Sequence, residues 1–87
     1  MKYNFSKVSI KTLDGQEVKE LHKILANAIY VSTKDLGLVK VAQDIYDGKE
    51  VEIWQAQAEE IKRVIQDEKT GFFAFVQAGL LEYIDKA

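Results

Sequence analysis

The chain has 87 residues, carries 12 Lys and Arg against 14 Asp and Glu, and has a formal net charge of −2. It contains no cysteine, which excludes disulfides and thiolate metal sites, and its basic residues are interleaved with acidic ones, which argues against nucleic-acid binding. With 47% hydrophobic and 30% charged residues, the composition is typical of one small folded domain, which we expect to span residues 1–87.

No segment has the pattern of a signal peptide or of a membrane span. The N-terminal stretch MKYNFSKVSIK lacks the apolar core of a signal peptide. The longest nearly apolar run, residues 71–84, is interrupted by Gln77 and Glu82 and is shorter than the ~20 residues that a bilayer requires. We therefore expect a cytoplasmic protein that has no membrane partner.

Residues 3–12 are rich in β-branched and aromatic side chains that alternate with polar ones, as in a strand. The apolar positions change phase between Phe5 and Val8, and one straight strand cannot present both sets on the same face. The pattern therefore predicts a bulge or bend near Ser6 and Lys7.

Asp14 and Gly15 form a dipeptide that tolerates positive φ, which predicts a β-hairpin turn. Val18 would then lie on the return strand, opposite Ile10 or its neighbour. The alternative is a capping box, in which Asp14 caps a helix and Glu17 bonds back to it. We favour the hairpin.

Four segments show the apolar period of amphipathic helices, and the first includes Ile24 in its apolar stripe while the third begins its stripe at Trp54. The spacing of Ser32 and Asp35 predicts a capping box before the second helix, and Gly48 is placed to end it in the left-handed conformation. The predicted helices cover approximately residues 19–31, 34–47, 54–66 and 71–86.

Between the second and third helices, alternation predicts a short strand at about residues 50–53, with Val51 and Ile53 directed inward. The predicted fold class is therefore α+β and mostly helical. It consists of a short N-terminal β-hairpin and one further short strand packed with four helices.

The sequence DGQEV at residues 14–18 returns as DGKEV at residues 47–51. We interpret both as a turn glycine followed by a strand whose valine points inward. An ancient duplication and a ligand-binding loop are the alternatives, although no glycine-rich phosphate-binding motif is present.

A second echo joins ANAIY at residues 26–30 to AQDIY at residues 42–46. The simplest interpretation is that each helix ends on Ile-Tyr, with the ring packed and the hydroxyl in water. The alternative is that Tyr30 and Tyr46 form a paired aromatic surface for a partner.

The sequence contains no recognisable catalytic, cofactor-binding or metal-binding motif. His22 is the only histidine, and one histidine without cysteine does not make a typical zinc site. Glu59 and Glu60 are adjacent on a predicted helix, so their side chains diverge instead of forming a catalytic pair. We expect a non-enzymatic protein without a cofactor.

The last segment, GFFAFVQAGLLEYI, is the most informative, because its helix would be apolar around nearly its whole circumference. Such a helix is either the central element of the core or lies partly against another chain. The residues that we assign to a partner-binding surface are Phe72, Phe73, Phe75, Val76, Leu80, Leu81 and Tyr83.

In order, the chain has a predicted short N-terminal strand and the blocks DGxEV, A-x-A-I-Y, DLGLVxxAxxIYDGKEVEI and GFxAFVxxGLLEYI. Over roughly residues 8–84, this order resembles small phage-encoded and prophage-encoded proteins associated with virion and tail assembly. This resemblance implies a chaperone-like assembly protein that binds a partner transiently. It implies no functional residue.

Two functions remain open at this point. The first is a non-enzymatic, phage-derived interaction protein that binds itself or a phage structural protein through its C-terminal helix. The alternative is a small regulatory protein, antitoxin-like or nucleic-acid-modulating, which would require Lys23, Lys62, Arg63 and Lys69 to converge on one face.

Overall fold

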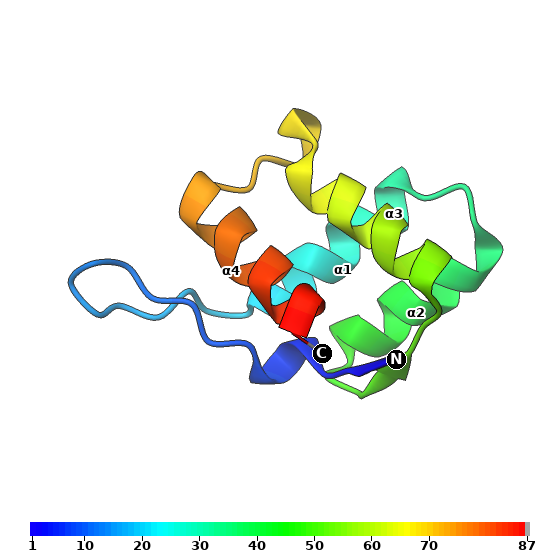
Figure 1. Ribbon diagram of the computed structural model, residues 1–87, viewed down its shortest axis with the longest axis horizontal. Helices are drawn as coiled ribbons and strands as arrows, with labels where there is room; N and C mark the ends of the chain where they lie inside the picture. Colours follow the sequence, from blue (N-terminus) through cyan, green and yellow to red (C-terminus); the bar gives the residue numbers. More distant parts are fainter. Residues whose placement is uncertain (87) are drawn as a thin grey trace.

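A computed structural model describes residues 1–86 and shows the predicted fold class, which is α+β and mostly helical (Figure 1). α3 and α4 lie in front of α1 in this view, and α2 is packed beside α1. The contact between α1 and α2 is the most extensive one between any two elements. The elements in chain order are β1 (Lys2–Tyr3), η1 (Phe5–Lys7), α1 (Leu21–Ser32), α2 (Leu36–Tyr46), β2 (Val51–Glu52), α3 (Gln55–Gln66), η2 (Glu68–Thr70) and α4 (Ala74–Lys86).

The two short strands pair antiparallel, with Tyr3 opposite Val51. The strand predicted near residues 50–53 is present, and Val51 and Ile53 both point into the core. The predicted bend also exists, because the chain forms the single 3₁₀ turn η1 directly after Tyr3. This turn lets both apolar phases of the N-terminal segment reach the interior.

The N-terminal hairpin is confirmed. Gly15 has a φ of +87°, and the Val18 amide donates to the Ile10 carbonyl at 2.9 Å. Lys11 and Glu17 form an antiparallel bridge between the two arms. The capping-box alternative at Asp14 is wrong, since α1 begins only at Leu21.

The first two helices are close to their predicted limits, with corrections at their starts. Glu20 has a φ of +55°, a left-handed conformation that cannot continue a helix, so α1 starts later than residue 19. The capping box at Ser32 is wrong, because Ser32 is the last residue of α1. Asp35 caps α2 by accepting a hydrogen bond from the Gly37 amide at 2.8 Å.

The ends of α2, α3 and η2 follow local sequence signals. Gly48, with a φ of +77°, ends α2 as predicted, and Gly71, with a φ of +76°, ends η2. Trp54 does not belong to the apolar stripe of α3. It is the N-cap residue and is 67% exposed, because the stripe that faces the core starts one turn later, at Ala58.

The buried residues form one hydrophobic cluster to which every α-helix, η1 and both strands contribute. The side chains that are almost completely inaccessible include Tyr3, Phe5, Leu25, Ile29, Leu38, Ile45, Ile53, Ile61, Ile65 and Leu80. The core therefore lies between the α1–α2 pair on one side and α3, α4 and the N-terminal segment on the other.

Candidate protein-binding surfaces

The N-terminal end of α4 presents two exposed aromatic rings, Phe73 and Phe75, which we call the aromatic patch. The Phe73 ring is 74% exposed and the Phe75 ring 42%. Their centroids are 6.3 Å apart and their planes are nearly parallel at 10°. No charged residue occurs between Thr70 and Leu81, so a partner could cover the patch without stripping water from a charge on this segment.

The other predicted partner-binding residues lie elsewhere. Val76 and Leu80 are buried on the face of α4 that meets the core, so a partner cannot reach them without unfolding the helix. Three more, Phe72, Leu81 and Tyr83, are half-buried and pack against the same core. Of the seven residues assigned from sequence, the exposed ones are those of the aromatic patch.

The N-terminal segment, which we define as residues 1–10, lies against the part of α4 that follows the patch. The closest approach is at Gly79, where the methyl group of an alanine would lie 2.6 Å from Ile10 Cδ1 and 2.8 Å from Ile10 Cγ1. The Asn4 amide donates to Tyr83 Oη at 2.8 Å, and Tyr83 Oη donates to the Asn4 carbonyl at 3.2 Å. Glycine at position 79 therefore allows the hairpin to rest directly on the helix.

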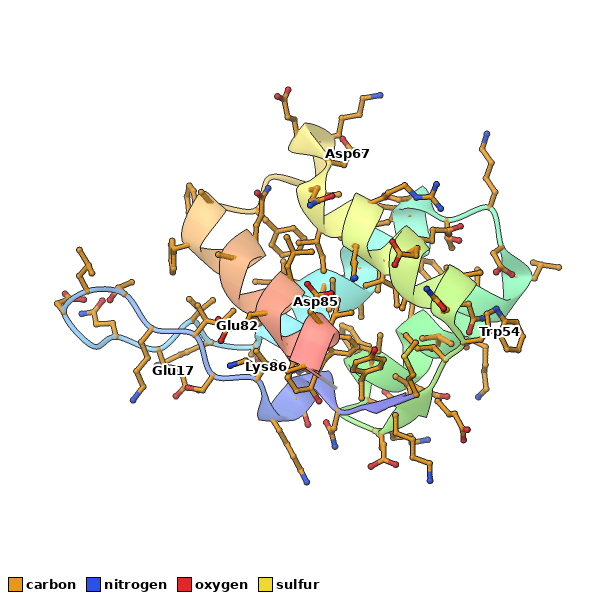
Figure 2. All side chains as sticks on the ribbon, viewed as in Figure 1. Glu17, Trp54, Asp67, Glu82, Asp85 and Lys86 are labelled. Atoms are coloured by element: carbon orange, nitrogen blue, oxygen red, sulfur yellow. The ribbon has the colours of Figure 1, made fainter. Side chains whose placement is uncertain are left out.

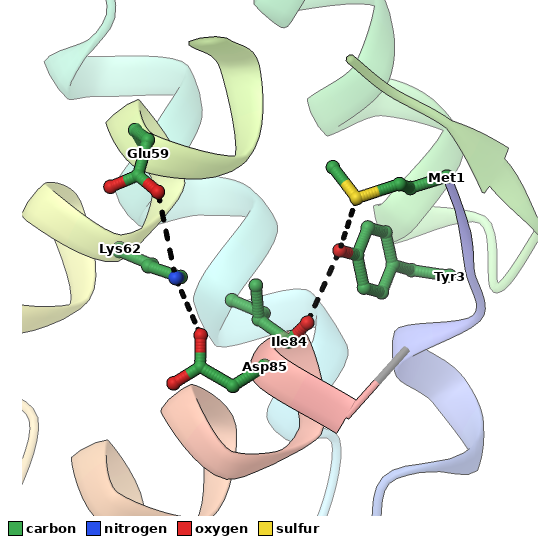
Figure 3. Close-up of polar contacts among 6 residues, drawn as sticks. All are labelled: Met1, Tyr3, Glu59, Lys62, Ile84 and Asp85. Carbon is green, nitrogen blue, oxygen red and sulfur yellow. Dashed lines mark hydrogen bonds and ion pairs between the residues drawn. The ribbon is translucent and has the colours of Figure 1, made fainter. Parts of the chain in front are cut away.

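Tyr3 ties the N-terminus to the end of α4 (Figure 3). Its hydroxyl donates to the Ile84 carbonyl at 3.2 Å and lies 3.5 Å from Met1 Sδ. Burial raises the pKa of Tyr3 above its ordinary value, a shift that the nearby Lys62 ammonium partly opposes. The neutral phenol is therefore the form that this contact stabilises.

A second surface lies on the opposite side of the core, between α1 and α2. Here a groove of about 430 Å³ runs between the two helices. Its lining includes both tyrosines of the repeated A-x-x-I-Y pattern and both alanines, and the alanines are buried beneath the other side chains. The full lining is Ala26, Asn27, Tyr30, Ala42, Gln43, Tyr46 and Asp47.

Exposed apolar side chains continue beyond the groove along both helices. Val31 on α1 is 80% exposed and Leu36 on α2 is 86% exposed, and Ile24 and both tyrosines are about half exposed. The prediction that Ile24 lies in the buried stripe of its helix is therefore wrong, because Leu21, Leu25 and Ile29 fill that stripe. We call this surface the α1–α2 face.

The tyrosine pair matches neither interpretation in full. The rings of Tyr30 and Tyr46 are only half covered by the chain, and they share one groove. The ammonium of Lys23 lies over the Tyr46 ring, 5.4 Å from its centroid. This arrangement favours the alternative of a paired aromatic surface.

The two DG motifs share their turn chemistry, as the sequence indicated, since Gly15 and Gly48 both have positive φ. Their surroundings differ. Gly15 lies at an open hairpin tip, whereas an added methyl group at Gly48 would lie 3.7 Å from Ser6 Cβ.

The cations required by the regulatory alternative are partly neutralised. Lys62 lies between two carboxylates, 2.5 Å from Asp85 and 3.6 Å from Glu59 (Figure 3). The hydrogen bond to Asp85 raises the pKa of Lys62. The ammonium of Lys23 is 3.5 Å from the Glu20 carboxylate. Two of the four cations therefore have carboxylate partners in the same chain, which weakens the support for a nucleic-acid surface.

His22 and the charged side chains of the helices lie at the surface or at its margin. His22 is half-buried at the start of α1, beside a shallow hollow that Glu17 and Glu20 also line. Within residues 1–86, no three His, Asp or Glu side chains approach one another in a way that could hold a metal ion. Charged residues such as Asp67, Glu82 and Lys86, which are labelled in Figure 2, are exposed.

Sequence reasoning gave the pairing of Tyr30 and Tyr46 as an alternative but missed the exposed apolar side chains around them, although a signal for these was present. α1, with the sequence LHKILANAIYVS, has apolar residues at more than half of its positions, as α4 does. The apolar run is longer and less interrupted in α4 than in the other helices, yet α1 also carries more apolar surface than one stripe can bury.

Comparisons with protein families, with curated proteins and with solved structures found no match to this chain. In the described part of the chain, no helix is both long enough and apolar enough to cross a membrane.

Proposed function

We propose that this chain is a non-enzymatic interaction protein that binds an apolar segment of a partner protein through the aromatic patch. The observation that carries the proposal is the pair of stacked, exposed phenylalanine rings within a stretch that has no charge. Clustered aromatic side chains are frequent anchors of protein interfaces.

The class of partner follows from the same surface. Phe73 and Phe75 lie beside the small exposed side chains of Ala74 and Ala78, which leave space for a second helix to approach closely. We therefore propose an amphipathic helix as the bound element. The resemblance to phage assembly proteins suggests that such a helix belongs to a phage structural protein, with the present chain acting as a transient, chaperone-like cover.

The rigid part of the protein supports this role. Buried Val76 and Leu80 anchor α4 to the core, and Ile10 of the N-terminal segment packs against α4 at Gly79. The patch is thus presented on a fixed helix, so little conformational entropy is lost when a partner binds.

The proposal is tested by measuring binding to a panel of amphipathic helical peptides and to the proteins encoded beside this chain, using fluorescence anisotropy. The variant Phe73→Ser/Phe75→Ser should weaken binding by on the order of 30-fold, since removing two anchors costs about 2 kcal/mol or more. The matched control is Leu13→Ser, because Leu13 is fully exposed at the hairpin tip.

Binding that is equally strong in the double serine variant would place the interface elsewhere. A complete lack of binding to every peptide and neighbouring protein at micromolar concentration would overturn the proposal. Circular dichroism of both variants shows whether each retains the fold.

A further inference from the structure

The α1–α2 face has the side-chain pattern of a helix-packing surface. On α2, exposed or half-exposed residues recur at spacings of three, four and three, at Leu36, Val39, Gln43 and Tyr46. On α1 the corresponding positions are Ile24, Asn27 and Val31, again with spacings of three and four. Such alternating spacings keep one side of a helix against a neighbouring helix.

The antiparallel pairing of α1 and α2 sets the order of these residues along the face. A connection of three residues, 33–35, makes α1 and α2 antiparallel (Figure 1). Lys23 lies against the Tyr46 ring, which fixes how far the two helices are shifted along each other. Both helices rise by about 1.5 Å per residue, so Asn27, one turn after Lys23, lies level with Gln43. One turn further, Val31 lies near Leu36 at the start of α2. Each helix thus has an exposed apolar residue at one end, Val31 or Leu36, and an amide in the middle. At the other end a charged residue, Lys23 or Asp47, lies beside Ile24 or Tyr46.

The polar end carries complementary charge. Asp47 follows the last residue of α2, and among residues 1–86 no Lys, Arg or His lies within ion-pair distance of its carboxylate. Lys23 lies at the same level on α1 and is held only at the surface, by Glu20 and by the Tyr46 ring. The face therefore holds one anion and one cation at one end, while Lys40, which is paired with Asp44, and Lys69 lie at its two edges.

We propose that the α1–α2 face is covered by the same face of a second copy of this chain. A two-fold axis parallel to the helices places α2 of each copy against α1 of the other without changing the level of any residue. Leu36 then meets the region of Val31, Gln43 meets Asn27, and Asp47 meets Lys23. Each pairing occurs twice, as in any two-fold interface.

The resulting assembly is an antiparallel four-helix bundle, in which short hairpins supply neighbouring helices. The buried alanines, Ala26 and Ala42, leave the groove between the helices open for the side chains of the other copy. Tyrosines that line the groove and charges near its edge match the composition of protein interfaces. This dimer is independent of the aromatic patch, which stays free on the other side of the core.

The first experiment is sedimentation velocity from about 1 to about 300 µM, where a dimer of twice 9.9 kDa is expected. Asp47→Lys or Lys23→Asp alone should raise the dimer dissociation constant at least about tenfold, because each change makes two symmetric pairs repulsive. An equimolar mixture of the two variants should restore dimers, since both pairs of the mixed dimer are again attractive.

A second experiment uses the absence of cysteine from the sequence. Chains with Asn27→Cys and chains with Gln43→Cys, mixed under mild oxidation, should form a mixed disulfide faster than either forms one with itself. Both positions are exposed, so the fold should tolerate the changes. Preferential self-linking of Asn27→Cys would show α1 against α1 and overturn the arrangement.

The outcomes separate this inference from the proposed function. The variant Phe73→Ser/Phe75→Ser should remain dimeric while losing the partner, whereas Asp47→Lys should keep the partner while losing the dimer. A protein that is monomeric over the whole concentration range, a dimer insensitive to both charge reversals, or a dimer abolished by the serine variant would each overturn the second-copy interface.

Discussion

α1 and α4 are similar in composition, since both are apolar around most of their circumference. They differ in how much of that apolar surface other segments of the chain cover. α4 is buried along Val76, Leu80 and Ile84, and the flank that carries Gly79 and Tyr83 is covered by Ile10 and Asn4. α1 is buried along an equivalent stripe, but within residues 1–86 the exposed sides of Tyr30 and Val31 have no such cover.

The difference shows that apolar circumference alone does not identify a binding surface. The N-terminal segment comes from the far end of the sequence and covers α4 at Gly79 and Tyr83, whereas the aromatic patch stays exposed. On the outer side of α1, Lys69 and Thr70 border a hollow that Ile24 and Val31 also line, yet both of these apolar side chains stay about half exposed or more.

The largest expected effect tests the contrast between the buried and exposed residues of α4. Leu80→Ala should lower the free energy of unfolding by about 2–5 kcal/mol, because it creates a cavity in the core. Phe73→Ala should change it by less than about 0.5 kcal/mol, since the ring is mostly in water. Urea unfolding measures both, and similar losses would mean that the patch belongs to the core.

A somewhat smaller effect is expected where the N-terminal segment touches α4. Gly79→Leu should destabilise the protein by about 1–3 kcal/mol, because the new side chain would occupy the position of Ile10. In an Ile10→Ala background the same substitution should cost less, since space is then available. Strictly additive losses in denaturant unfolding would contradict this direct contact.

A loss of about 1 kcal/mol is expected from Tyr83→Phe, which removes the hydroxyl that bonds both backbone groups of Asn4. The Asn4 amide should also exchange its hydrogen with solvent faster, which NMR can follow. Unchanged exchange at Asn4 would show that the hydroxyl does not hold the N-terminal segment on α4.

The smallest effect concerns pH and Tyr3. Because burial raises the pKa of Tyr3 above 10.0, the folded chain keeps a proton that the unfolded chain loses. Its contribution is complete below the unfolded pKa and is lost as the pH rises through the folded pKa. The urea midpoint of the parent should therefore fall above about pH 10 more steeply than that of Tyr3→Phe. Parallel curves would contradict this assignment.

Local signals in the sequence predicted most of the secondary structure. Asp14-Gly15 predicted the hairpin, Gly48 the end of α2, and the phase change after Phe5 the bend at η1. Each depends on the conformational preference of a few neighbouring residues, which does not require knowledge of the rest of the fold. The errors at Ser32, Trp54 and Ile24 arose where two helical ends or two faces were locally compatible and packing chose between them.

The sequence by itself therefore determined the elements, the α+β class and the excess of apolar surface in α4. Only the tertiary structure decided which part of that excess remains outside, because Ile10 and Asn4 reach α4 from about 70–80 positions away along the chain. It also brought Tyr30 and Tyr46 to one groove. The spacing of apolar residues indicates which side of a helix is apolar. Whether that side is buried depends on which distant segments of the chain pack against it.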